Sequence, residues 1–264
     1  MFSADLGVQP TSGGGFSPTS ISNLTAWFKA DAGITKDASN LVSAWKDQGA
    51  NAYSAVQATG TRQPTWTASV QNSLPAVYFS SKWLSVASGV TAFASTFPQH
   101  TIYLAFRPDL TQTSDTYHGA FCAGNGGSSG VNTSIGVLAT STDKRHWYGG
   151  WGQDSTWAAT APQYTQTWYF NGKVWDGTNV LGYSNGTLLI TKATTYTTGN
   201  GAIDIGRQFN STSLGLYVGY VGEVVLYARA LSTTERQKIE GYLAWRWGLQ
   251  ANLPSGHPYQ SAPP

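Results

Sequence analysis

The stretch HWYGGWGQDSTW at residues 146–157 has the composition of a ligand-binding loop. Its aromatic side chains can cover the apolar face of a sugar ring, and its amide and carboxylate groups can bond to sugar hydroxyls. The same aromatic cluster can contact a protein partner, or it can fill a hydrophobic core. All three alternatives stay open. The candidate residues for a glycan or partner contact are Trp147, Tyr148, Trp151, Gln153, Asp154 and Trp157.

Glycoside hydrolysis needs two carboxylates, about 5 Å apart for retention and further apart for inversion. The chain contains three glutamates. Glu235 follows Ser232 at the spacing of a helix capping box, and we expect Glu240, on the same predicted helix, to be solvated. Glu223 has no acidic residue two or five positions further on. We therefore expect no enzymatic activity, and a glycoside hydrolase that relies on aspartates is a remote alternative.

Histidine and cysteine do not have the spacing of a zinc site. The four histidines, at 100, 118, 146 and 257, form no HxxxH or HxH pattern. Cys122 is the single cysteine, which excludes an intrachain disulfide, and we expect it to be a small buried residue. His257 is predicted to pack the C-terminal tail against the preceding helix.

The amino-acid composition limits the possible fold classes and the possible classes of partner. Charged residues make up 11% of the 264 residues, against about 25% in an average domain. The formal net charge of +2 does not favour nucleic acid as a partner. The chain contains no run of 18 apolar residues, which is the length that a membrane-spanning helix needs. The abundance of Trp, Tyr and Gly instead indicates an all-β protein.

The strands that must position these residues are short and bounded by turns. Runs at 101–106, 135–139 and 220–227 have strand length, and Asn185-Gly186 between two apolar arms predicts a β-hairpin over 180–190. About a dozen such strands predict a β-sandwich of two antiparallel sheets. One C-terminal α-helix is expected at 233–247. Residues 24–264 thus form one predicted domain that includes the helix and a Pro-rich tail.

Residues 1–23 are rich in Gly, Ser, Thr and Pro, and they lack the basic start and apolar middle of a secretory signal. A flexible leader and an assembly arm are both compatible with this composition. We expect an arm that attaches the domain to a neighbouring surface. Its few apolar anchors are Phe2, Leu6, Val8 and Phe16.

The order of segments along the chain resembles a known superfamily. WFKADAGI, AWKDQG, LPAVYF, YSNGTLLI, IDIGR and the closing GYVGEVVLYARALSTTERQKIEGYLAWRWGL are similar to the laminin-G-like branch of the concanavalin A-like lectin/glucanase superfamily. The closing helix with LPSGHPY resembles the version in bacteriophage virion and bacterial surface proteins. The resemblance covers residues 24–260, and it implies a jelly-roll sandwich without fixing a function.

Two further expectations come from this resemblance. Glycosidases of the superfamily carry a Glu-x-Asp-x-x-Glu cluster, which is absent around Glu223. Laminin-G-like domains often bind calcium, and Asp31 and Asp47 are the weak candidate ligands here. The alternative, which we favour, is that both aspartates cap turns. No other cofactor is expected.

The sequence therefore predicts a non-enzymatic structural or adhesion protein, most simply a phage virion component such as a capsid decoration or a tail or fibre appendage. Its partners would be other virion or surface-assembly proteins, contacted through the N-terminal arm, and it would be a homo-oligomer or present in many copies. The alternative is a carbohydrate-binding module that recognises cell-surface glycans. The expected location is the virion, or else the extracellular space or cell surface.

Overall fold

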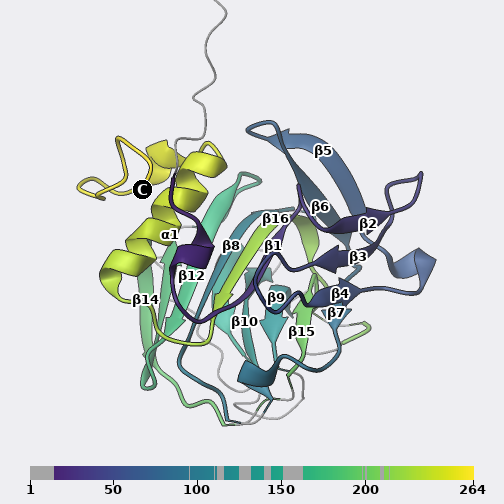
Figure 1. The fold of residues 1–264 in the computed structure, drawn as a ribbon, viewed down its shortest axis with the longest axis horizontal. Helices are drawn as coiled ribbons and strands as arrows, with labels where there is room; N and C mark the ends of the chain where they lie inside the picture. Colours follow the sequence, from purple (N-terminus) through teal and green to yellow (C-terminus); the bar gives the residue numbers. More distant parts are fainter. Residues whose placement is uncertain are drawn as a thin grey trace, which may run out of the picture.

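The short apolar runs form antiparallel strands, whose alternating side chains can reach the space between two sheets. The computed structural model shows two such sheets packed face to face (Figure 1). Sheet A contains, in spatial order, β14 (Thr187–Ala193), β13 (Asn179–Ser184), β12 (Tyr169–Trp175), β8 (His100–Pro108), β16 (Val218–Tyr227), β6 (Leu74–Ser80) and β5 (Thr65–Gln71), and β1 (Leu24–Lys29) also pairs with β16.

Sheet B has the order β11 (Lys144–Gly149), β10 (Thr133–Ala139), β9 (Thr116–Ala123), β15 (Ile203–Ile205), β7 (Leu84–Val86), β4 (Ser54–Val56), β3 (Val42–Lys46) and β2 (Ile34–Lys36). The structure describes residues 15–94, 96–109, 111, 116–124, 132–139, 144–150, 163–197, 199, 201–208, 211–213 and 215–264. Within these ranges the chain is the predicted all-β sandwich with one α-helix near its C-terminus. Three-residue 3₁₀ helices are η1 (Pro18–Ser20), η2 (Gly60–Arg62), η3 (Thr91–Phe93) and η4 (Gln250–Asn252).

Two hydrophobic cores hold these layers together. The larger core lies between the sheets and includes the fully buried Trp45, Phe79 and Phe106. The second core lies between the outer face of sheet A and α1 (Thr233–Arg246), which crosses that face in Figure 1. There the indole of Trp247 stacks on that of Trp168 with ring centroids 4.8 Å apart. Cys122 is buried, as expected.

Helix α1 begins and ends where the local sequence predicts. The Ser232 side chain accepts from the Glu235 backbone, and the Glu235 carboxylate accepts from the Ser232 N–H at 3.0 Å, which completes the capping box. Arg229 binds the same carboxylate and holds the pKa of Glu235 at about 2. At the other end Gly248 takes a φ of +66°, and the N–H of Leu249 bonds back to the helix.

Replacing Ser232 by Ala should lower the free energy of unfolding by about 1 kcal/mol, because the N–H of Glu235 loses its side-chain acceptor. Denaturant unfolding followed by far-UV circular dichroism measures this difference. Ser232→Thr keeps the hydroxyl and should cost less than Ser232→Ala; equal losses for the two variants would contradict the cap.

The predicted hairpin is confirmed. Strands β13 and β14 are joined by Asn185 and Gly186, whose φ values are +48° and +81°. Both residues tolerate this left-handed backbone, which a two-residue hairpin turn with the right-handed twist of the strands requires. The Asn185 side chain also accepts from the backbone N–H of Phe170 at 3.0 Å, so it ties the turn to β12.

Part of the predicted N-terminal arm packs on the domain. The ring of Phe16 meets that of Tyr242 at 6.1 Å, and the N–H of Phe16 donates to the carbonyl of Pro264 at 3.3 Å. Tyr227 donates its hydroxyl to the carbonyl of Pro18 at 2.7 Å. Phe16 and Pro18 of the predicted arm therefore contact the domain directly. The other three predicted anchors, Phe2, Leu6 and Val8, lie outside the described residues.

Candidate functional site

A cavity of about 310 Å³ opens where the edges of the two sheets meet. Sheet A ends there at β5 and sheet B ends at β2, and Figure 1 shows these strands at the same side of the molecule. The loop between β1 and β2 forms one wall. The cavity is lined by Ala30, Asp31, Ala32, Gly33, Ile34, Lys36, Trp66 and Pro75.

Trp66 supplies the aromatic surface of this cavity. It lies on the edge strand β5, is half-buried against the main core, and donates its indole N–H to the carbonyl of Ala30 at 2.8 Å. This bond fixes the plane of the ring. A fixed indole beside an open cavity can take the apolar face of a ring-shaped ligand without a large loss of side-chain entropy.

Asp31 supplies a carboxylate to the same cavity, and the side chains around it hold it in place. Its Oδ2 accepts from the Arg246 guanidinium at 2.7 Å, and its Oδ1 lies 3.8 Å from the ammonium of Lys29. The Asp31 side chain is 31% exposed. It therefore has an acceptor oxygen available to a hydroxyl group while its orientation is set by Arg246.

Arg246 is itself fixed by the buried carboxylate of Glu223. Oε1 of Glu223 accepts from the Trp27 indole at 2.6 Å and from the Tyr242 hydroxyl at 2.7 Å. Oε2 accepts from Arg246 Nε at 2.8 Å and from the Trp247 indole at 3.1 Å. Four donors satisfy a side chain with no exposed surface. Glu223 thus joins β16 and β1 to α1. Its buried carboxylate, with all four donors supplied by the protein, stabilises the fold.

The aromatic residues predicted from 146–157 do not form an exposed platform in the described part of the chain. Tyr148 is completely buried between the sheets and donates to the carbonyl of Tyr183 at 2.5 Å. Trp147 is also completely buried, 5.0 Å from the ring of Tyr117. Tyr148 belongs to the core between the sheets, whereas Trp147, the adjacent residue of β11, is buried on the other face of the strand. Trp151, Gln153, Asp154 and Trp157 lie outside the described residues.

The two calcium candidates are engaged in other contacts. Asp31 pairs with Arg246, as above. Asp47 is 3% exposed, and its Oδ1 accepts from the backbone N–H groups of Trp27 and Gly49 at 2.5 and 2.8 Å. Burial raises the pKa of Asp47, and these backbone bonds oppose the rise. The described residues hold no group of three or more metal-ligating side chains. Asp47 thus caps a turn, which is the alternative that we favour over calcium binding.

The structure corrects the prediction that Glu240 is solvated. It is fully buried and not solvated, because α1 turns it toward sheet A. Its Oε1 accepts from the Tyr103 hydroxyl at 2.7 Å and from Arg236 at 2.6 Å, and its Oε2 lies 3.2 Å from Nε2 of His257. His257 therefore packs the tail against the helix, as expected.

Sequence reasoning missed Trp66 and Lys36. Neither residue stands in a motif, and Trp66 is separated from Asp31 by 35 residues, so no local pattern could connect them. The signal that could have pointed to Trp66 was its position as an aromatic residue in the polar segment that begins directly after Pro64. Across the described ranges, no helix is both long and apolar enough to cross a membrane.

The β-sandwich fold of this chain is similar to that of several solved structures. The chain is similar to a GH54 α-L-arabinofuranosidase (TM-score 0.61, 10% identity, 78% of this chain and 51% of that one). It is also similar to domain 4 of AbnA, a GH43 extracellular arabinanase from Geobacillus stearothermophilus, in complex with arabinotriose (TM-score 0.52, 15% identity, 81% and 96%).

A third similar structure is the Trypanosoma rangeli sialidase in complex with sialic acid (TM-score 0.52, 14% identity, 86% of this chain and 33% of that one). The chain thus spans about half of the arabinofuranosidase and a third of the sialidase. At these identities the likeness establishes the jelly-roll sandwich and nothing finer. No protein-family model and no curated protein sequence matches the chain. The laminin-G-like branch and the phage connection stay predictions.

Proposed function

We propose that this protein is a non-catalytic carbohydrate-binding module, and that the cavity beside Trp66 holds one sugar unit of its glycan. The observation that carries the proposal is the pairing of a fixed indole with an oriented carboxylate in one open cavity. The sandwich fold, which the chain shares with domains of glycan-acting proteins, supports it.

The two side chains have complementary roles in such a site. Trp66 offers an apolar surface to the C–H face of a sugar ring, and this contact excludes water. Asp31 accepts a hydrogen bond from a hydroxyl group of the same unit and fixes its orientation. Because Asp31 already accepts from Arg246, a sugar hydroxyl adds to an existing network and does not require a side chain to be ordered first.

Absence of catalysis is part of the proposal. The buried carboxylates Glu223 and Glu240 are each surrounded by protein donors and have no exposed surface. Asp31 is the carboxylate that lines the cavity. A glycosidase needs a second carboxyl group on the other side of the scissile bond, and the lining residues supply none. Release of reducing sugar from a polysaccharide panel would overturn this part.

Replacing Trp66 by Ala should weaken glycan binding at least tenfold, because the cavity loses its only aromatic surface. Titration calorimetry with arabinotriose and a panel of neutral and acidic oligosaccharides measures the dissociation constants. Tyr220→Ala is the matched control: it also removes a half-buried aromatic side chain from sheet A, but it lies outside the cavity lining. Binding that survives Trp66→Ala in a folded variant would exclude the cavity as the site.

We further propose that the module works in a multi-copy assembly such as a virion, to which its N-terminal segment attaches it. The support is the composition of residues 1–23 and the resemblance of the C-terminal segment to virion and surface proteins. Negative-stain imaging of the native source, with an antibody against the domain, tests this location. Labelling of isolated molecules alone, with none on a particle or cell surface, would contradict it.

A further inference from the structure

The charges around the cavity do not cancel. Two carboxylates, Asp31 and Glu223, face two cations, Lys29 and Arg246, in a connected set of contacts at 2.7–3.8 Å. These four groups form a neutral network. Lys36 lines the same cavity and stands outside this network. Its charge is therefore the unbalanced one in the cavity.

Lys36 has a neutral partner in place of a carboxylate. Its Nζ donates to the side-chain carbonyl of Asn40 at 2.5 Å and lies over the face of the Trp66 ring, 4.7 Å from the ring centre, in a cation–π contact. Among the described residues, no carboxylate lies within ion-pair distance of this ammonium. The nearby Asp37 uses its Oδ1 to accept from the backbone N–H groups of Ser39 and Leu41.

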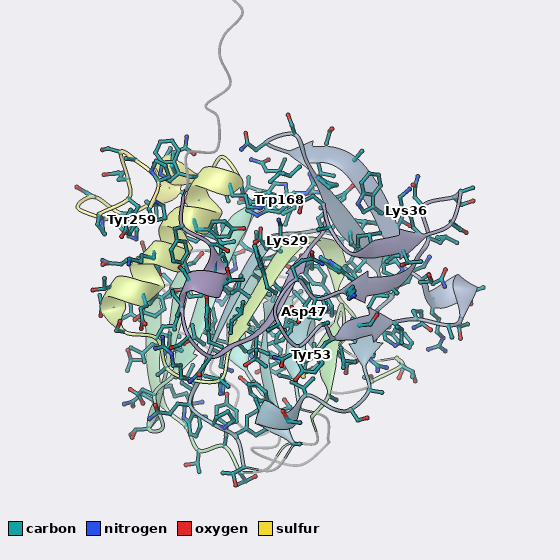
Figure 2. All side chains as sticks on the ribbon, in the orientation of Figure 1. Lys29, Lys36, Asp47, Tyr53, Trp168 and Tyr259 are labelled. Atoms are coloured by element: carbon teal, nitrogen blue, oxygen red, sulfur yellow. The ribbon has the colours of Figure 1, made fainter. Side chains whose placement is uncertain are left out.

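The position of Lys36 suits contact with a ligand. It is the last residue of β2, and Figure 2 shows its side chain at the outer edge of the molecule beside β2 and β5. An ammonium with three donors and one neutral acceptor can still bind an anion. A cation next to an aromatic surface also partly loses its water when a ligand covers both groups, which strengthens its attraction to a negative charge.

We infer that the sugar unit bound in this cavity is acidic, with its negatively charged group on Lys36. This inference rests on the proposed function and specifies its ligand class. The sugar ring would lie against Trp66, one hydroxyl would donate to Asp31, and the anionic group would accept from the Lys36 ammonium. Carboxylated and sulfated sugars share this chemistry, because a lysine ammonium acts as a point charge without geometric preference.

Trigalacturonic acid, its uncharged methyl ester and a sulfated galactose trisaccharide are suitable probes for calorimetric titration of the full chain. The unmodified protein should bind the acid about tenfold more tightly than the ester, and added salt should reduce this preference. Lys36→Gln should remove the preference, so that the acid and the ester bind this variant with equal affinity. Lys238→Gln, which makes the same charge change on α1, should retain it.

Each outcome of this titration decides one question. Equal affinity for acid and ester in the unmodified protein overturns the acidic-sugar inference, as does a preference that survives Lys36→Gln. If the acidic-sugar inference fails but the ester or arabinotriose still binds through Trp66, the proposed carbohydrate-binding function stands. If no probe binds, the proposed function fails. Comparison of the carboxylated and sulfated probes identifies which anionic group the cavity accepts.

Discussion

Replacing Glu223 by Gln is expected to lower the free energy of unfolding by about 3–5 kcal/mol. The carboxylate accepts from two donors on each oxygen, and the glutamine amide would direct its own N–H groups at one of these pairs. Arg246, whose side chain is 21% exposed, would keep its contact with Asp31 but lose its buried anion. Directing amide N–H groups at buried donors leaves those donors without an acceptor, which is far more costly than losing a surface ion pair.

Denaturant unfolding at pH 7 measures this loss, and Glu235→Gln is its matched control. Glu235 also accepts from an arginine and from backbone, but its side chain is 30% exposed, so its replacement should cost about 1 kcal/mol. Similar losses for the two variants would show that the buried network adds nothing. Glu223→Gln should also weaken glycan binding, because Arg246, which orients Asp31, would lose the buried anion that fixes its own position.

Acid should destabilise the protein well above the pH at which carboxylates titrate. His100 and His146 are fully buried, and burial lowers the pKa of each to about 3. In the unfolded chain these side chains titrate near 6.5. As the pH falls below 6.5, the unfolded chain therefore binds protons that the folded chain does not, and the free energy of unfolding decreases by up to about 1.4 kcal/mol per pH unit for each histidine.

The local contacts support neutral rings at both positions. His100 lies between the carbonyl of Pro98 at 3.0 Å and the hydroxyl of Thr133 at 2.9 Å, which suits one protonated and one unprotonated nitrogen. Nδ1 of His146 lies 3.0 Å from the side-chain amide of Asn171, an N–H donor. A second proton on His146 would place a ring N–H against the N–H of the Asn171 amide, so that both groups would be donors.

Unfolding measured between pH 7.5 and 5 isolates the histidines, since the window lies above the range of ordinary carboxyl groups. We expect a loss of about 4 kcal/mol over this range, about 2 kcal/mol from each histidine. His100→Phe and His146→Phe should flatten the dependence on pH even if each lowers stability at pH 7.5, because aromatic rings surround both positions. An unchanged slope in the double variant would show that other groups cause the acid sensitivity.

Features that depend on neighbouring residues could be predicted from the sequence. The Asn185-Gly186 turn requires two left-handed residues in succession, and the chain offers them between two apolar arms. The Ser232–Glu235 capping box and the terminal Gly248 bound the helix through contacts within five residues. Short-range geometry decides such elements. A chain with many short strands and few charged residues can bury the apolar faces of those strands in a β-sandwich.

The site could not be predicted in this way, because strand pairing across the whole chain creates it. The cavity brings Asp31 and Lys36 beside Trp66, and Glu223 reaches it through an arginine 23 residues away. The same pairing buries Trp147 and Tyr148, although their composition suits an exposed platform. Composition determines which side chains can bind a sugar. Which of them face solvent is decided by the tertiary structure, because Trp147 and Tyr148 point to opposite faces of β11 and both are covered.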